Sequence, residues 1–147
     1  MQYRTVGDIT ITNTLSATED TIASAVAIKL LFTSFQSMPV LDYSGKVVGK
    51  VTEMDVLKAL MSGKDLRAIH VGEIMSPASP VVMSDTPLEE TIVIIDANRL
   101  TQLPVMKDGR FIGCVTRHDL LRAWLGEWVD HEKGSYAEVI DYTLGRF

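Results

Sequence analysis

Two seven-residue stretches have the same form: GKVTEMD at 49–55 and GCVTRHD at 113–119. Each reads glycine, any residue, valine, threonine, two free positions and aspartate. A threonine three residues before an acid is typical of a capping box at a helix start. A carboxylate can also accept hydrogen bonds from two neighbouring hydroxyl groups, and a helix start offers N–H groups to an anion. The motif therefore predicts either one helix cap used twice or two halves of a ligand site.

The two motifs belong to a longer internal repeat. When 38–61 is aligned with 103–125 and Tyr43 is treated as an insertion, nine of 23 pairs are identical. Upstream, TVGDI at 5–9 matches HVGEI at 70–74, and the offset of 65 residues is the same in both places. A fixed offset at two separated sites indicates a duplicated unit.

Each unit is predicted to begin with a short strand and a helix. In the second unit Thr86 is the expected N-cap, with Pro87 at the first helical position and Glu89 completing a capping box. The segment TIVIID at 91–96 favours a strand by propensity, but the cap and the repeat favour a helix. The first unit should begin its helix near Thr18, with one apolar face formed by Ile22, Val26 and Leu30.

Two strands and a second helix complete each unit. The strands are expected at 38–42 and 46–51, and at 103–107 and 110–115. Between them, YSG and DG are hairpin-turn signals, since glycine adopts positive φ freely. The second helix should start at the motif threonine and stop before Gly63 or Gly126.

This periodicity divides the chain into repeat 1 (1–63), repeat 2 (64–126) and a C-terminal tail (127–147). The connector at 62–70 is too short for a flexible tether, so the repeats are expected to pack together. The tail is predicted to form a short helix with an apolar stripe of Tyr136, Val139, Ile140, Leu144 and Phe147.

The composition is that of a folded protein with an acidic balance. Of the 147 residues 46% are hydrophobic and 22% charged, and the net charge is −5. Because no basic cluster is present, nucleic acid is not an expected partner. The start lacks an apolar signal core, no apolar run is long enough to cross a bilayer, and Cys114 stands alone. These features predict a cytoplasmic protein that does not enter a membrane.

The residues xPVxxxxGxxxGxhTxxD, present twice, together with VGEIM at 71–75, resemble a tandem pair of cystathionine β-synthase (CBS) domains, a Bateman module. The resemblance covers about residues 5–126. It implies an α/β (α+β) fold of two β-α-β-β-α units packed through their sheets with pseudo-twofold symmetry. It further implies a non-catalytic regulatory module, a homodimer, that binds AMP, ADP, ATP or S-adenosylmethionine in two clefts between the repeats. So short a chain is expected to regulate another protein.

By the same resemblance, the motif aspartate binds the ribose hydroxyls and the threonine helps to hold phosphate. The floor of each cleft is contributed by the opposite repeat. One cleft is expected to contain Thr116, Arg117, His118 and Asp119 with Thr5, Thr10, Phe35 and Gln36. The other is expected to contain Thr52 and Asp55 with His70, Met75, Leu100 and Thr101.

The two free positions of the motif predict different ligands. Arg117 and His118 suit an anion, whereas Glu53 and Met54 do not, so the Asp119 cleft is the better candidate for a charged ligand. The basic residues that family members often carry just before the proline are missing, because Gln36-Ser37 and Thr101-Gln102 stand there.

The alternative is a protein-interaction scaffold of the same fold with vestigial clefts, which the missing basic residues favour. An enzyme is not expected, since no nucleophile or acid–base pair is evident, and Cys114 reads as a buried apolar residue. No catalytic cofactor and no metal-ligand spacing is predicted.

Overall fold

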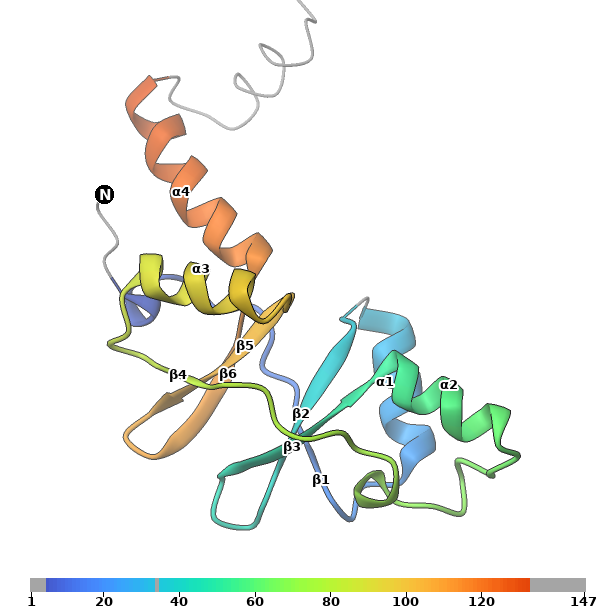
Figure 1. Cartoon of the computed structure of the whole chain (residues 1–147). Coiled ribbons are helices and arrows are strands. Elements are labelled where there is room, and N and C mark those ends of the chain that lie inside the picture. Colours follow the sequence, from blue (N-terminus) through green and yellow to red (C-terminus); the bar gives the residue numbers. More distant parts are fainter. Residues whose placement is uncertain (1–4, 34, 133–147) are drawn as a thin grey trace, which may run out of the picture.

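The structure, a computed structural model, describes residues 5–33 and 35–132, with side chains described up to residue 125. Within these ranges the chain forms two three-stranded sheets, each with two α-helices (Figure 1). The first repeat contains a short 3₁₀ helix η1 (Val6–Asp8), β1 (Ala17–Thr18), α1 (Ala23–Thr33), β2 (Ser37–Leu41), β3 (Val47–Thr52) and α2 (Glu53–Met61). The second contains η2 (Val71–Glu73), β4 (Val82–Met83), α3 (Leu88–Ala97), β5 (Gln102–Lys107), β6 (Arg110–Thr116) and α4 (Arg117–Glu132).

The two sheets have the same topology. In each, the short first strand runs parallel to the second, and the second pairs antiparallel with the third, giving the orders β1-β2-β3 and β4-β5-β6. The strand–helix–strand–strand–helix order and the mixed α/β class are therefore as the sequence predicted. The DG turn also has the expected geometry, since Asp108 and Gly109 both adopt positive φ, at 51° and 76°.

Each hydrophobic core is completed by the N-terminal segment of the opposite repeat. Val6, just after the chain start, is fully buried in the core of repeat 2 together with Val82, Leu88, Leu103 and others. Val71 is likewise fully buried in the core of repeat 1, with Val26, Val40 and Val51. We call the two exchanged segments, 5–13 and 70–76, the N-terminal arms. In Figure 1 the blue η1 accordingly lies beside α3.

The glycine that follows each buried valine lets the arm approach the other backbone closely. Gly7 N–H donates to the carbonyl of Ser84 at 2.6 Å, and Gly72 N–H to that of Glu19 at 3.0 Å. A Cβ on Gly7 would lie 2.9 Å from the Ser84 oxygen, and one on Gly72 would lie 3.2 Å from the Glu19 Cβ. The VGDI and VGEI segments are therefore docking segments: the valine fills the core and the glycine permits the approach.

A chain of buried polar groups joins the two sheets. Asn13, 1% exposed, donates its side-chain amide to Gln102 Oε1 at 2.8 Å, and Gln102 Nε2 donates to the Ser37 carbonyl at 2.9 Å. The carbonyl of Asn13 accepts from the N–H of Cys114 at 2.7 Å. Because buried amides are costly to leave unpaired, this chain fixes one arrangement of the repeats.

The first helix of each repeat starts later than the sequence predicted. Thr18 belongs to β1, where it pairs with Leu41, and α1 begins only at Ala23 because the loop between them receives η2. Of the expected apolar face, Val26 and Leu30 are buried, but Ile22 lies before the helix and is 46% exposed.

In the second repeat, α3 begins at Leu88 and Thr86 is not its N-cap. The Thr86 hydroxyl instead accepts from the N–H of Met83, so the expected capping box with Glu89 does not form. The helix over TIVIID is confirmed.

The second helices end differently. Gly63 takes the left-handed conformation, with φ +81°, just after α2, as predicted. Gly126 does not end α4, which continues to Glu132. A single glycine costs a helix only about 1 kcal/mol, and no proline follows it to enforce a stop. Residues 127–132 therefore continue α4, and the predicted apolar stripe at 136–147 lies outside the described residues.

We expect Val71→Ala to destabilise the chain by about 2 kcal/mol, since it removes two methyl groups from a sealed core of the other repeat. Urea denaturation measures the change. Val81→Ala is the control, because Val81 is 41% exposed, and it should change stability by less than about 0.5 kcal/mol. Equal losses in the two variants would contradict the exchange of arms.

Candidate functional site

Both motif aspartates form the predicted capping boxes. The Thr52 hydroxyl accepts from the N–H of Asp55 at 3.0 Å, and Asp55 Oδ2 accepts from the N–H of Thr52 at 2.9 Å. Thr116 and Asp119 repeat this arrangement, with both distances 3.0 Å. One oxygen of each carboxylate is thus used in starting α2 or α4, and the other is available to a different partner.

The second oxygen of each aspartate accepts a hydrogen bond from the N-terminal arm of the opposite repeat. The Ser76 hydroxyl donates to Asp55 Oδ1 at 2.7 Å, and the Thr12 hydroxyl donates to Asp119 Oδ1 at 3.0 Å. The exchange of arms therefore gives Oδ1 of each motif aspartate a hydroxyl donor from the other repeat.

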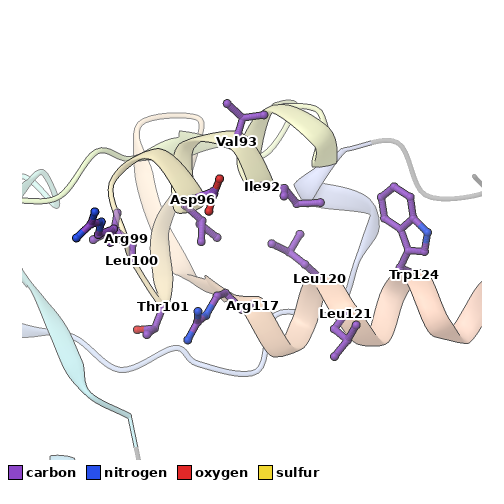
Figure 2. A pocket seen from close by; sticks show the side chains of 11 residues that line it. Ile92, Val93, Asp96, Arg99, Leu100, Thr101, Arg117, Leu120, Leu121 and Trp124 are labelled. Atoms are coloured by element: carbon purple, nitrogen blue, oxygen red, sulfur yellow. The ribbon is translucent and has the colours of Figure 1, made fainter.

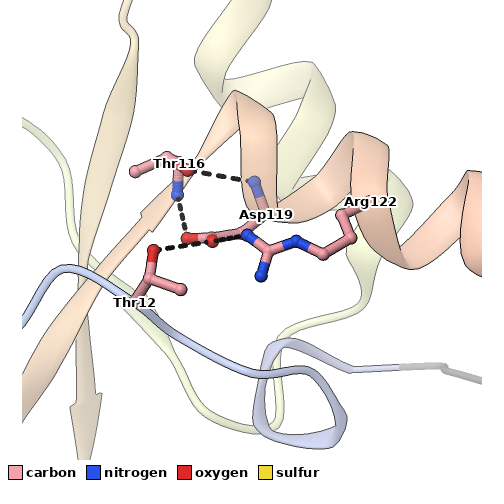
Figure 3. Close-up of polar contacts among 4 residues, drawn as sticks. All are labelled: Thr12, Thr116, Asp119 and Arg122. Atoms are coloured by element: carbon pink, nitrogen blue, oxygen red, sulfur yellow. Dashed lines mark hydrogen bonds and ion pairs between the residues drawn. The ribbon is translucent and has the colours of Figure 1, made fainter.

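The two aspartates differ in a third partner. Arg122 donates from Nη2 to Asp119 Oδ1 at 2.9 Å, one helical turn after the motif (Figure 3). The Asp119 side chain is 0% exposed, while that of Arg122 is 38% exposed. The corresponding residue after Asp55 is Lys58, which is exposed, and the structure records no ion pair between these two described residues.

An open cleft of about 430 Å³ lies beside the Thr52 motif, between the repeats. Its walls join the start of α2 to the end of α3. The lining residues are Gln36, Ser37, Lys50, Thr52, Glu53, Met54 and Leu57 from repeat 1, with Arg99, Leu100 and Thr101 from repeat 2.

Two cations and one acid line this cleft. Lys50, on β3, donates from Nζ to the Ser79 hydroxyl at 2.9 Å. Arg99 follows α3 in the left-handed conformation, with φ 52°, which is uncommon for a residue with a side chain. With Glu53 opposite, the cleft has a net positive lining next to a helix N-terminus, a setting that favours an anion.

The predicted residues of the Asp55 cleft divide into two groups. Thr52, Leu100 and Thr101 line the cleft, and Asp55 is half-buried and not part of its lining. Met75 packs over Gly49, where its sulfur would lie 2.8 Å from an added Cβ. His70 caps η2, with its N–H donating to Glu73 at 2.7 Å and its side chain 59% exposed.

The predicted residues of the other cleft are more scattered. Gln36 lines the Thr52 cleft rather than a separate one. Thr5 caps η1 through Asp8, in the manner of His70. Arg117 lines the groove between α3 and α4, described next. The remaining three are Thr10 and His118, which are exposed, and Phe35, which is half-buried.

Helices α3 and α4 enclose an apolar groove of about 780 Å³ (Figure 2). Its apolar lining is Ile92, Val93, Ile95, Leu100, Leu120, Leu121 and Trp124, with Asp96, Arg99, Thr101 and Arg117 at the polar edge. On repeat 1 the matching helices α1 and α2 also leave large apolar side chains exposed: Leu31, Phe32, Leu57, Leu60 and Met61.

Comparison with known proteins identifies this arrangement. The model of the CBS domain matches the chain twice, over residues 6–62 and 71–126. The chain belongs to the CBS domain family. The paired match, in one chain with this fold, makes it a tandem CBS pair.

Similar proteins include both large and small chains. Arabinose 5-phosphate isomerase KdsD of Pseudomonas aeruginosa is 34% identical over 85 residues, which are 57% of this chain and 26% of the isomerase. The CBS pair thus spans about a quarter of that relative. The structure of CBSX2 in complex with AMP is 29% identical with a TM-score of 0.69, covering 84% of this chain and 98% of CBSX2. The CBS-pair protein CBSX2 from Arabidopsis thaliana is 28% identical with a TM-score of 0.70, covering 83% and 94%.

Sequence reasoning missed four contacts of the CBS pair. Thr12 and Ser76 are short hydroxyl residues that the pattern did not mark, because their partners belong to the other repeat. Arg99 lines the cleft from a left-handed backbone conformation, which the sequence does not predict. Arg122 had a visible signal, since it lies three residues after Asp119 on a helix and such pairs meet.

The described residues contain no helix long and apolar enough to cross a membrane. Among them, no group of three or more His, Cys, Asp or Glu side chains is placed to hold a metal ion.

The Cys114 thiol is buried on β6, close to Asp119. Burial chiefly, and the negative charge of Asp119 next, raise its pKa from 9.0 to about 12. The thiol therefore stays protonated over the physiological range, and the interpretation of Cys114 as a packed side chain rather than a nucleophile agrees with this environment.

We expect Cys114 to react with iodoacetamide at pH 8 roughly a thousandfold more slowly in the folded chain than in urea, since three pKa units separate the two thiols. Only the unfolded chain loses this proton between pH 9 and about 12, so the thiol's contribution to stability is lost as pH rises through that interval. Mass spectrometry follows the alkylation. Equal rates with and without urea would contradict the burial of the thiol.

Proposed function

We propose that this CBS pair is a regulatory module that binds an adenosyl ligand, one of AMP, ADP, ATP or S-adenosylmethionine, between its repeats. The proposal rests on the open cleft that lies between the start of α2, at Thr52 and Glu53, and Arg99 and Thr101 of repeat 2. The module does no chemistry itself, and its ligand alters a protein partner.

The chemistry of the cleft suits such a ligand. Phosphate or another anionic group would lie at the start of α2, between Lys50 and Arg99, where N–H groups and cationic side chains converge. Asp55 lies next to this position, and its Oδ1 would exchange the Ser76 hydroxyl for a ribose hydroxyl of similar hydrogen-bonding character. Leu57 and Leu100 offer apolar surface to the base.

The comparison with CBSX2 supports this proposal. That protein binds AMP, and it resembles the chain over nearly its whole length. The family resemblance alone does not choose between AMP and its relatives, but the two cations of the cleft favour a ligand with at least one phosphate.

We expect calorimetry to detect AMP, ADP, ATP or S-adenosylmethionine at sub-millimolar dissociation constants. Asp55→Ala should weaken binding about tenfold to a hundredfold, because a charge-assisted hydrogen bond is lost. Lys50→Ala should weaken the binding of the phosphorylated ligands more than the binding of adenosine.

Asp65→Ala is the matched control, since Asp65 is exposed in the connector and contacts Arg67 instead of the cleft. Circular dichroism checks that Asp55→Ala keeps its helices after losing a capping box. If none of the four ligands binds to the folded protein, the interaction-scaffold alternative replaces the proposal.

We also propose that the module is a homodimer that buries the apolar faces of its helix pairs. Leu31 and Phe32 on α1 are 78% and 81% exposed, and Met61 on α2 is 87% exposed. Leu121 and Trp124 on α4 are 56% and 46% exposed beside the large groove. Large exposed apolar side chains gathered on helix faces are typical of protein contacts, and a second copy presents the same faces in return.

Light scattering after gel filtration should give twice the chain mass of 16.2 kDa. Leu121→Glu should shift the protein toward the monomer, since a charge cannot be buried in an apolar interface without a partner. Tyr43→Gln is the control, because Tyr43 is 92% exposed on the β2–β3 turn and away from both faces. A monomer in the unaltered protein, or dissociation by both substitutions, would contradict this assignment.

A further inference from the structure

The two motif aspartates have the same backbone role but opposite accessibility. Asp119 has a side chain that is 0% exposed, whereas Asp55 is half-buried beside an open cleft. Asp55 keeps part of its surface open to solvent, directly after Thr52, Glu53 and Met54, which line the cleft. The Asp119 side chain has no exposed surface at which a ligand could make a first contact.

Three protein groups cover Asp119 and supply three of the roughly four hydrogen bonds that a carboxylate can accept. Oδ2 accepts from the N–H of Thr116, and Oδ1 accepts both from the Thr12 hydroxyl and from the Arg122 guanidinium. The arginine also neutralises the carboxylate. One ligand hydroxyl could replace that of Thr12, but a diol that also displaced the arginine would leave a buried charge without its counter-ion, which is strongly unfavourable.

The Asp55 side has no such counter-ion. Ser76 provides one neutral hydroxyl to Oδ1, and a ribose hydroxyl replaces it like for like. Lys58, in the position of Arg122, extends from an exposed site on α2. The only cations that line the adjoining cleft, within the part of the chain that the structure describes, are Lys50 and Arg99.

Arg117 and His118, which favoured the Asp119 cleft in the sequence, lie on the first turn of α4. Arg117 lines the α3–α4 groove, while its N–H donates to the carbonyl of Thr101 at 3.0 Å. His118 is exposed on the first turn of α4. We therefore base the choice between the two sites on the surroundings of the two aspartates.

We propose that the module takes one adenosyl ligand per chain, at Asp55, and that Arg122 acts as a built-in occupant that keeps the Asp119 site closed. This inference rests on the proposed function, since it assigns the adenosyl ligand to one of two similar sites. Arg122 is a positioning residue: it contacts the carboxylate and never the ligand.

Calorimetric titration with AMP tests the assignment through stoichiometry. The unaltered chain should bind one AMP, and Asp55→Ala should lose at least tenfold in affinity. Arg122→Ala should bind two. The double variant Asp55→Ala/Arg122→Ala should regain one, because the Asp119 carboxylate is then free to accept ribose hydroxyls.

Lys58→Ala is the matched control, at the same helix position in the other repeat, and it should leave the stoichiometry at one. Arg122→Gln, which keeps the side-chain stem but not the charge, is used if the alanine variant does not fold. If neither variant folds, the unaltered chain and Asp55→Ala decide between the sites.

Two AMP per unaltered chain, or full affinity in Asp55→Ala, would overturn the inference while leaving the proposed function intact. The same holds if folded Arg122→Ala still binds one AMP and the double variant binds none. Absence of binding of any adenosyl ligand to the unaltered chain would instead overturn the proposed function, and the inference with it.

Discussion

Val6 and Val71 each bury a side chain in the core of the opposite repeat, and the rest of the fold depends on this exchange. A single repeat has its sheet and helices but lacks the valine that closes its core. The glycine after each valine then holds the arm against the other backbone at hydrogen-bond distance. The repeats therefore form one cooperative structure even though the sequence reads as two consecutive units.

The same exchange determines what surrounds the motif aspartates. Each arm continues toward the helix start of the opposite repeat, and its hydroxyl residue reaches Oδ1 of the aspartate there. Each site is thus composite, with the acid from one repeat and the hydroxyl from the other. The two sites differ on the next helical turn, where Arg122 pairs with Asp119 and the exposed Lys58 occupies the same position after Asp55.

Most of the fold was predictable because its signals are local or repeated. The hairpin strands, their glycine turns and both motif capping boxes follow from residues within a few positions of each other. The errors have tertiary causes. Thr18 and Thr86 resemble N-caps, but Thr18 pairs as a strand residue and the Thr86 hydroxyl turns back to Met83.

The candidate site was less predictable than the fold. Motif positions identified Thr52, Leu100 and Thr101 as neighbours, since the family pattern fixes which segments meet. It could not place Arg99, whose side chain reaches the cleft through a left-handed backbone. Nor could it tell that Arg117, which follows the motif threonine directly, faces a groove between helices. The direction in which a side chain leaves a helix depends on tertiary packing, which the motif does not encode.

The exchanged arms also impose an order on folding during synthesis. A chain emerges from the ribosome N-terminus first, and domains generally fold as they become available. Here Val6 emerges about a hundred residues before its neighbours Leu103, Val105 and Val115. The first repeat, in turn, cannot close its core until Val71 has emerged. The arm that carries Val6 therefore has no core to enter until the second repeat is synthesised, and the core of the second repeat is closed by a residue that precedes the sheet of the first.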